Sequence, residues 1–83
     1  MKPIDINIVY TEIIEKLKAS NNTHIITELE KSSAVAVTGS EALMNQASFL
    51  MSLRQSNPSA FNLIEAQIGN YLKYCRQNGL VIR

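Results

Sequence analysis

Along the last third of the chain, apolar side chains recur at spacings of three and four residues. The series is Phe61, Ile64, Ile68, Tyr71 and Cys75. This spacing places one apolar row along an α-helix, whereas a half-buried strand has a period of two. Asn57 and Pro58 precede the row as typical helix-start residues. Gly79 follows it as a left-handed C-cap, with Leu80 placed for the apolar contact of a Schellman motif. The sequence therefore predicts a helix over about residues 58–78.

A first helix is expected near the N-terminus, where two periods compete. The segment PIDINIVY alternates isoleucine with polar residues, which is the period of a strand. From residue 6 onward the spacing becomes helical, in the longer series Ile6, Tyr10, Ile13 and Leu17. Because the longer pattern is favoured, we predict a helix over about residues 7–20, with Asp5 or Asn7 as its N-cap. Asn21 and Asn22 are expected to form the turn that follows.

The next segment, THIITELEKSSAVAVTG, has two possible readings. One helix face would carry Ile25, Ile26, Leu29, Ser33, Ala36 and Val37. The small and β-branched run SAVAV near its end also fits a short strand. We prefer a helix over about residues 23–37 and leave open whether residues 32–38 are helix or strand.

A third helix is predicted over about residues 41–55. Thr38 followed three residues later by Glu41 makes a capping box, in which each side chain accepts a hydrogen bond from an otherwise unpaired amide. The helix would carry a wide apolar surface, formed by Leu43, Met44, Ala47, Phe49, Leu50, Met51 and Leu53. Its two methionines could fill gaps in a core or form an adaptable binding surface.

Together these segments predict an all-α fold, a small bundle of three to four helices forming a single domain over residues 1–83. A chain of this length buries only about 60% of its unfolded surface, so its core is thin. The apolar surfaces of the first, third and fourth helices exceed what such a core needs. The surplus indicates a protein partner or a second copy of the chain.

The charge balance restricts the kind of partner. Eight Lys and Arg against seven Asp and Glu give a net charge of +1, and charged residues make up 18% of the chain. Such a surface has no strong positive field to attract nucleic acid or anionic lipid. The single cysteine allows no disulfide within the chain, and the N-terminal segment lacks the uninterrupted apolar run of a signal peptide. We therefore expect a cytoplasmic protein without a membrane span.

No group of residues in the sequence indicates catalysis, a metal site or a cofactor. His24 and Cys75, each the single residue of its type, lie on different predicted helices and have no identifiable third partner. A zinc site needs three or four ligands, and the three isolated glycines form no phosphate-binding loop. We expect no enzymatic activity, no cofactor and no small-molecule substrate. An enzyme would instead require a Cys75 thiol with a depressed pKa.

The sequence favours a non-enzymatic protein-interaction or regulatory module that acts through apolar helix faces as a homodimer. Aromatic and methionine side chains dominate interface energies, so the candidate partner-binding residues are Phe49, Met51, Leu53, Tyr71 and Tyr74. Gly69 also needs an explanation, because a glycine in mid-helix costs about 1 kcal/mol relative to alanine. It either allows another helix to approach closely or is a tolerated surface residue.

The alternative function is a DNA-binding regulator that uses the C-terminal helix. That helix, followed by Asn-Gly-Leu-Val, is similar to the end of a winged-helix recognition element. Its N-terminal half, however, offers Glu65 and no Lys or Arg to a DNA groove, and too few residues follow Val81 to form a wing. From Pro58 to the end of the given sequence, the basic residues are Lys73, Arg76 and Arg83. The sequence therefore argues against nucleic acid as the partner.

Overall fold

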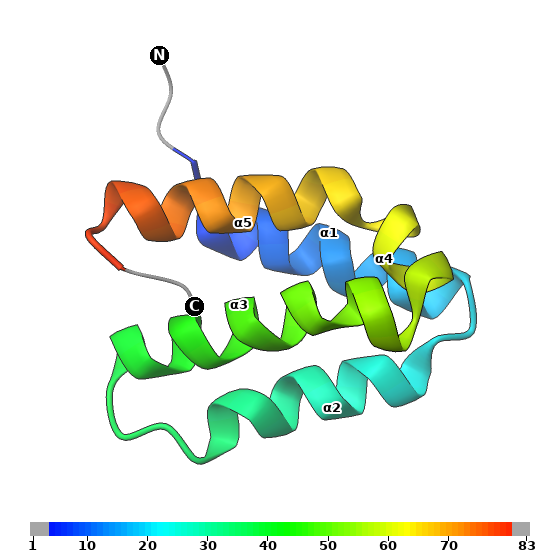
Figure 1. Cartoon of the computed structure of the whole chain (residues 1–83), viewed down its shortest axis with the longest axis horizontal. Helices are drawn as coiled ribbons and strands as arrows, with labels where there is room; N and C mark the ends of the chain where they lie inside the picture. Colours follow the sequence, from blue (N-terminus) through cyan, green and yellow to red (C-terminus); the bar gives the residue numbers. More distant parts are fainter. Residues whose placement is uncertain (1–3, 81–83) are drawn as a thin grey trace.

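The computed structural model describes residues 4–80, and this part of the chain contains five helices and no strand (Figure 1). The helices are α1 (Ile6–Ala19), α2 (Thr23–Ala34), α3 (Gly39–Ser56), α4 (Pro58–Leu63) and α5 (Glu65–Gln77). The predicted all-α bundle is confirmed. Its helix count is five in place of three to four, because the predicted last helix is divided in two.

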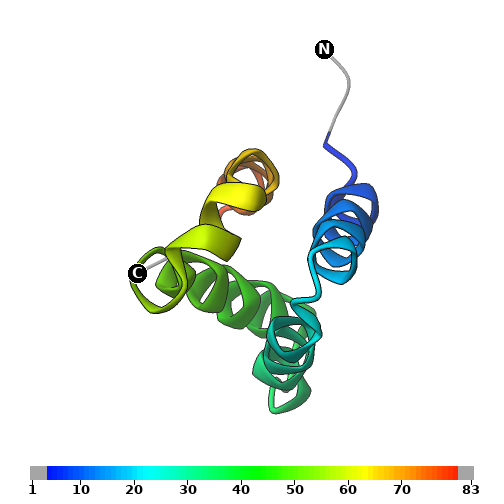
Figure 2. The same cartoon turned by 90° about the vertical axis from the view of Figure 1, so that its right-hand side faces the viewer.

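Each long helix runs in the opposite direction to the long helix before it. In Figure 1, α1 and α3 run from left to right, while α2 and α5 run back in the opposite direction. α5 packs against α1 and α3, α2 packs against the same two helices, and the short α4 packs on α3. The end-on view in Figure 2 shows these helices arranged around a shared centre. Short connections between antiparallel neighbours are typical of such a bundle.

The apolar rows expected from the sequence meet at that centre. The largest fully buried side chains are those of Ile13, Leu17, Leu29, Leu50, Ile64, Tyr71 and Cys75. They come from all four long helices and from the junction between α4 and α5. No charged side chain is buried among residues 4–80. Removal of apolar surface from water is therefore the main force that holds the helices together.

The predicted helix boundaries are built much as the sequence indicates. The Asp5 side chain caps α1 by accepting a hydrogen bond from the Asn7 amide at 2.9 Å. Asn21 has a φ of 61° and so forms the left-handed turn after α1. Thr38 Oγ1 accepts from the Glu41 amide at 3.1 Å, but the Glu41 carboxylate reaches the amide of Val37. Only one half of the predicted capping box is therefore present.

The end of α5 forms the predicted Schellman motif. Gly79 is left-handed, with a φ of 74°. The Leu80 amide donates to the Cys75 carbonyl at 2.9 Å, and the Gly79 amide donates to the Arg76 carbonyl at 3.1 Å. The Leu80 side chain packs against the core. This end of the bundle is thus closed by both hydrogen bonds and apolar contact.

The prediction of one continuous helix over residues 58–78 is wrong at Ile64. This residue has a φ of −116° and a ψ of 17°, and its amide is shared between the carbonyls of Ala60 and Phe61. The sequence has no glycine or proline here to indicate a break. The break has a tertiary cause: α4 packs on α3, whereas α5 turns back to lie between α1 and α3, with Ile64 fully buried at the corner.

The predicted second helix also ends earlier than expected, at Ala34 rather than at residue 37. Residues 35–38 form neither helix nor strand. Val35 and Val37 are 78% and 89% exposed, so a longer helix would gain little burial. The hydroxyl of Ser32 also donates to the carbonyl of Leu29 at 2.6 Å, and such bonds compete with regular helix geometry. Over the described residues, no helix is long and apolar enough to cross a membrane.

Asn57 provides a direct test of how α3 is joined to α4. Its amide donates to the Leu53 carbonyl at 2.8 Å, and its side-chain oxygen accepts from the Ala60 amide at 3.2 Å. We expect Asn57→Ala to lower the free energy of unfolding by about 1 kcal/mol, because an N-cap acceptor is lost. Asn57→Ser keeps an acceptor and should recover most of that loss. Urea denaturation followed by circular dichroism measures both, and equal losses would contradict the capping role.

Candidate interaction surface

A shallow groove lies between α3 and the segment formed by α4 and α5, and we call it the α3–α5 groove. Its volume is about 240 Å³, and its lining residues are Met51, Arg54, Phe61, Glu65, Ile68, Gly69 and Leu72. Four of these side chains are apolar and one residue has no side chain. The groove is therefore an apolar depression that is edged by one basic and one acidic group.

The α3 side of the groove is formed by Met51 and Arg54. Met51 is 42% exposed, which leaves its flexible thioether at the surface. The guanidinium carbon of Arg54 lies 5.8 Å from the centre of the Phe61 ring, within the range of a cation–π contact. This contact holds the basic group over the α4 end of the groove.

On the opposite side, Glu65 begins α5 and is exposed. A carboxylate in the first turn is favoured there by the helix dipole. Within residues 4–80 the single ion pair joins Lys31 to Glu28, so Arg54 and Glu65 form no ion pair with each other or with another described residue. The two edges of the groove therefore carry opposite charges that have no ionic partner in the described part of the chain.

Gly69 lies in the groove, in the middle of α5. A Cβ atom added at this position would meet no atom of another described element within 4 Å, so no described helix packs closely against it. Of the two explanations for Gly69, a close contact with another helix is therefore not found within residues 4–80. The residue is exposed, and the cost of a mid-helix glycine has no packing explanation within the described fold.

The five residues predicted to bind a partner lie in three different environments. Met51 lines the α3–α5 groove. Phe49 and Tyr74 are half-buried and do not line it. Leu53 and Tyr71 are buried in the core, where a partner cannot reach them in this fold. Their apolar surface is already used to hold the helices together, so of the five only Met51 belongs to the candidate surface.

The sequence gives no sign that the two charged residues of the groove, Arg54 and Glu65, line the same surface. Arg54 and Glu65 lie on either side of the SNPSA break, in helices with different directions. Their proximity depends on how far α4 carries the chain before α5 turns back, which residue spacing does not reveal. Phe61 was assigned to the buried row but is only half-buried, because the corner at Ile64 moves it to the edge of that row.

A second, more polar cleft lies between α1, α3 and α5. It has a volume of about 280 Å³ and is lined by Ile6, Asn7, Tyr10, Leu43, Gln46 and Tyr71. The Tyr71 hydroxyl donates to Gln46 Oε1 at 2.7 Å, which ties α5 to α3. Burial raises the pKa of Tyr71 well above its ordinary value, and nearby Cys75 and Tyr10 raise it further. Tyr71 therefore stays a neutral hydrogen-bond donor and acts as a structural residue.

Cys75 and His24 are not brought together. Cys75 is buried near the end of α5, and burial raises the pKa of its thiol. The depressed pKa that a reactive cysteine requires is therefore not found. His24 is exposed at the start of α2, which lies at the opposite end of the bundle from the end of α5 in Figure 1. No group of three or more potential metal ligands occurs in the described residues.

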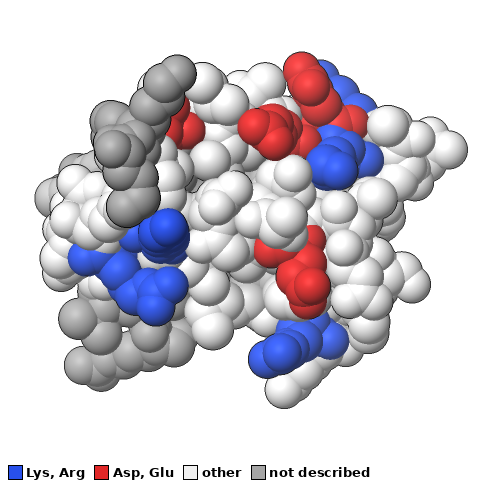
Figure 3. Space-filling model, turned by 90° about the horizontal axis from the view of Figure 1, so that it is seen from above, with Lys and Arg blue, Asp and Glu red and all other residues white. Residues whose placement is uncertain are grey.

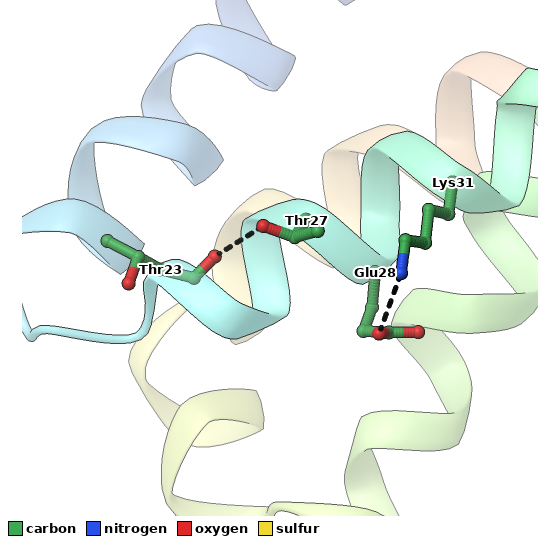
Figure 4. Close-up of polar contacts among 4 residues, drawn as sticks. All are labelled: Thr23, Thr27, Glu28 and Lys31. Atoms are coloured by element: carbon green, nitrogen blue, oxygen red, sulfur yellow. Dashed lines mark hydrogen bonds and ion pairs between the residues drawn. The ribbon is translucent and has the colours of Figure 1, made fainter.

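The charged side chains lie on the outside in small groups. Figure 3 views the molecule from above, over α1 and α5, and shows basic groups separated by acidic and uncharged surface. Lys73 and Arg76 are both exposed on α5. On α2, Lys31 Nζ lies 4.0 Å from Glu28 Oε1 (Figure 4). In the same helix, the Thr27 hydroxyl donates a hydrogen bond to the Thr23 carbonyl. Such exposed ion pairs contribute little to stability.

No protein-family model, curated protein or solved structure matches this chain. The residues of the α3–α5 groove and their contacts therefore carry the functional inference.

Tyr71→Phe tests the structural role of the buried hydroxyl. We expect it to lower the free energy of unfolding by about 1 kcal/mol at neutral pH, because Gln46 Oε1 loses its donor. In the wild type, stability should fall as the pH rises above about 10, where the tyrosine of the unfolded chain ionises while the buried one keeps its proton. Urea denaturation at increasing pH should show a smaller fall for Tyr71→Phe. Equal falls in both proteins would contradict the assignment.

Proposed function

We propose that this chain is a non-enzymatic, cytoplasmic protein-interaction module with a regulatory role, and that it self-associates through the α3–α5 groove. The observation that carries the proposal is the combination of an exposed Met51 and an open Gly69 in one apolar depression. A small domain that keeps apolar surface exposed commonly uses it to bind protein. A helix with an apolar face is the natural occupant of a groove between two helices.

Gly69 supports binding at this surface more directly than the apolar lining does. A glycine in mid-helix is destabilising by about 1 kcal/mol relative to alanine, and the bundle gains no packing from it. An approaching helix would gain, because the missing side chain lets its backbone or a large side chain come close to α5. An external contact would explain this glycine, which the packing within residues 4–80 does not.

The exposed Met51 of α3 lies on the side of the groove opposite Gly69 of α5. Thioether side chains adapt to irregular surfaces and are enriched at protein interfaces. Met51 and Phe61 line the same groove, and the Phe61 ring is covered on one side by Arg54. A partner that covers these side chains would bury apolar surface and exclude water from the cation–π contact. Contacts of this kind commonly provide most of the binding energy in small interfaces.

DNA binding receives less support. It would use Lys73 and Arg76, which are exposed and lie outside the α3–α5 groove. Phosphate contacts supply most of the affinity of non-specific DNA binding, and few basic groups are available here. Protein interaction therefore remains the better proposal.

Two methionines of α3 provide a matched test of the groove. Met51 and Met44 have similar exposure, 42% and 36%, but only Met51 lines the groove. We expect Met51→Glu to weaken self-association by about tenfold or more, which corresponds to at least about 1.4 kcal/mol, because a carboxylate would be buried at the interface. Met44→Glu should associate like the wild type. Light scattering on a size-exclusion column across a dilution series measures the mass of each protein.

Circular dichroism of the same samples provides the control, since both variants should keep the helicity of the wild type. Association that is lost equally in both variants, or in neither, would contradict the use of this groove.

Two substitutions at Gly69 separate folding from binding. Gly69→Ala and Gly69→Leu both replace glycine by a better helix former at an exposed position with open space. Each should raise the free energy of unfolding by about 0.5 to 1 kcal/mol. Gly69→Leu should nevertheless weaken self-association, because its side chain fills the groove. Undiminished association of the leucine variant in the same light-scattering series would show that no partner approaches here.

A further inference from the structure

We propose that two copies of this chain associate about a twofold axis, so that Arg54 of each copy pairs with Glu65 of the other across the α3–α5 groove. This inference rests on the proposed function, because it assumes that the groove is the binding surface. It adds the identity of the occupant, which is the α3 ridge of a second copy, meaning the exposed face of α3 that carries Met51 and Arg54. It also adds the charge pairing that sets the arrangement of the two copies.

The two edges of the groove carry opposite charges. Arg54 lies on the α3 side and Glu65 on the α5 side, and neither has an ion-pair partner among residues 4–80. A surface that carries one positive and one negative edge is complementary to a copy of itself. In a twofold interface each contact occurs twice, so that Arg54 meets Glu65 in one half and Glu65 meets Arg54 in the other.

The same charges exclude the competing orientation. If the second copy were turned so that α3 lay over α3 with like groups facing, Arg54 would meet Arg54 and Glu65 would meet Glu65. Like charges placed together in an interface are strongly disfavoured and select against that arrangement. The orientation that pairs opposite charges places the α3 ridge of one copy, with Met51, against the groove of the other.

The shape of the groove fits this occupant. Met51 projects from α3 next to the groove, and Gly69 leaves open space on the α5 side. The α3 ridge of a second copy therefore offers a flexible apolar side chain to a site that can receive one. A typical stable interface takes about 800 Å² from each partner, roughly one seventh of the 5420 Å² surface of this chain.

Charge reversal tests the pairing. The variants Arg54→Glu and Glu65→Arg each create two like-charge contacts in the twofold dimer, so each alone should dissociate about tenfold more readily than the wild type. When the two variants are mixed in equal amounts, positions 54 and 65 are both acidic in one chain and both basic in the other. Both contacts of the mixed dimer then join opposite charges. The mixture should therefore regain wild-type association as a dimer with one chain of each kind.

The measurement is light scattering across a dilution series, with native mass spectrometry to count each variant in the dimer. The double variant Arg54→Glu with Glu65→Arg should also dimerise, because it exchanges the charges and keeps their complementarity. Arg76→Glu and Glu15→Arg are the control reversals, because both residues are exposed and lie outside the groove. They should leave association unchanged.

Three results would overturn the proposed pairing: single reversals that associate like the wild type, a mixture that stays monomeric, or a monomeric wild type at every concentration. If Met51→Glu still abolishes association while the charge reversals have no effect, the groove remains the binding surface and only the twofold pairing fails. If Met51→Glu also has no effect, or the wild type does not associate, the proposed function fails with it.

Discussion

Burial of the α5 row between α1 and α3 is the contact on which the rest of the fold depends. α5 contributes three buried side chains, those of Ile68, Tyr71 and Cys75, and Ile64 is buried at the corner that precedes α5. α5 packs against both the first and the third helix, as α2 also does. The hydrogen bond from Tyr71 to Gln46 adds a directional restraint to an otherwise apolar contact. The apolar contacts and this hydrogen bond therefore fix both the position and the orientation of α5.

The α3–α5 groove is a consequence of the same packing. With Ile68 and Tyr71 turned inward, the next residues around α5 have to face outward, and these include Gly69 and Leu72 beside the groove. The corner at Ile64 places Phe61 of α4 under Arg54 of α3 and brings Glu65 of α5 to the opposite edge of the same groove. The shape of this candidate surface thus follows from where the core needs its apolar side chains. A rigid bundle can hold such a surface in place without ordering it on binding.

The division between core and candidate surface explains why residue type alone does not show which of the candidate partner-binding side chains are exposed. Tyr71 and Met51 were both chosen because their side chains are common at interfaces. Tyr71 is fully buried and bonded to Gln46, whereas Met51 projects at the surface. Both lie on amphipathic helices, and a broad apolar face does not reveal which of its edges will be covered. That depends on the angle at which the neighbouring helix crosses.

The sequence by itself determined the helical class, the apolar rows and most of the helix ends, because each depends on residues close together in the chain. Asp5, Asn21, Thr38 and Gly79 act through local hydrogen bonds or backbone geometry, and their roles could be predicted. Only the packing of the helices on one another sets the corner at Ile64, the early end of α2 at Ala34 and the presence of Arg54, Phe61 and Glu65 around one groove. These features balance local helix preference against burial on a neighbouring helix, and the neighbour is known only once the chain has folded.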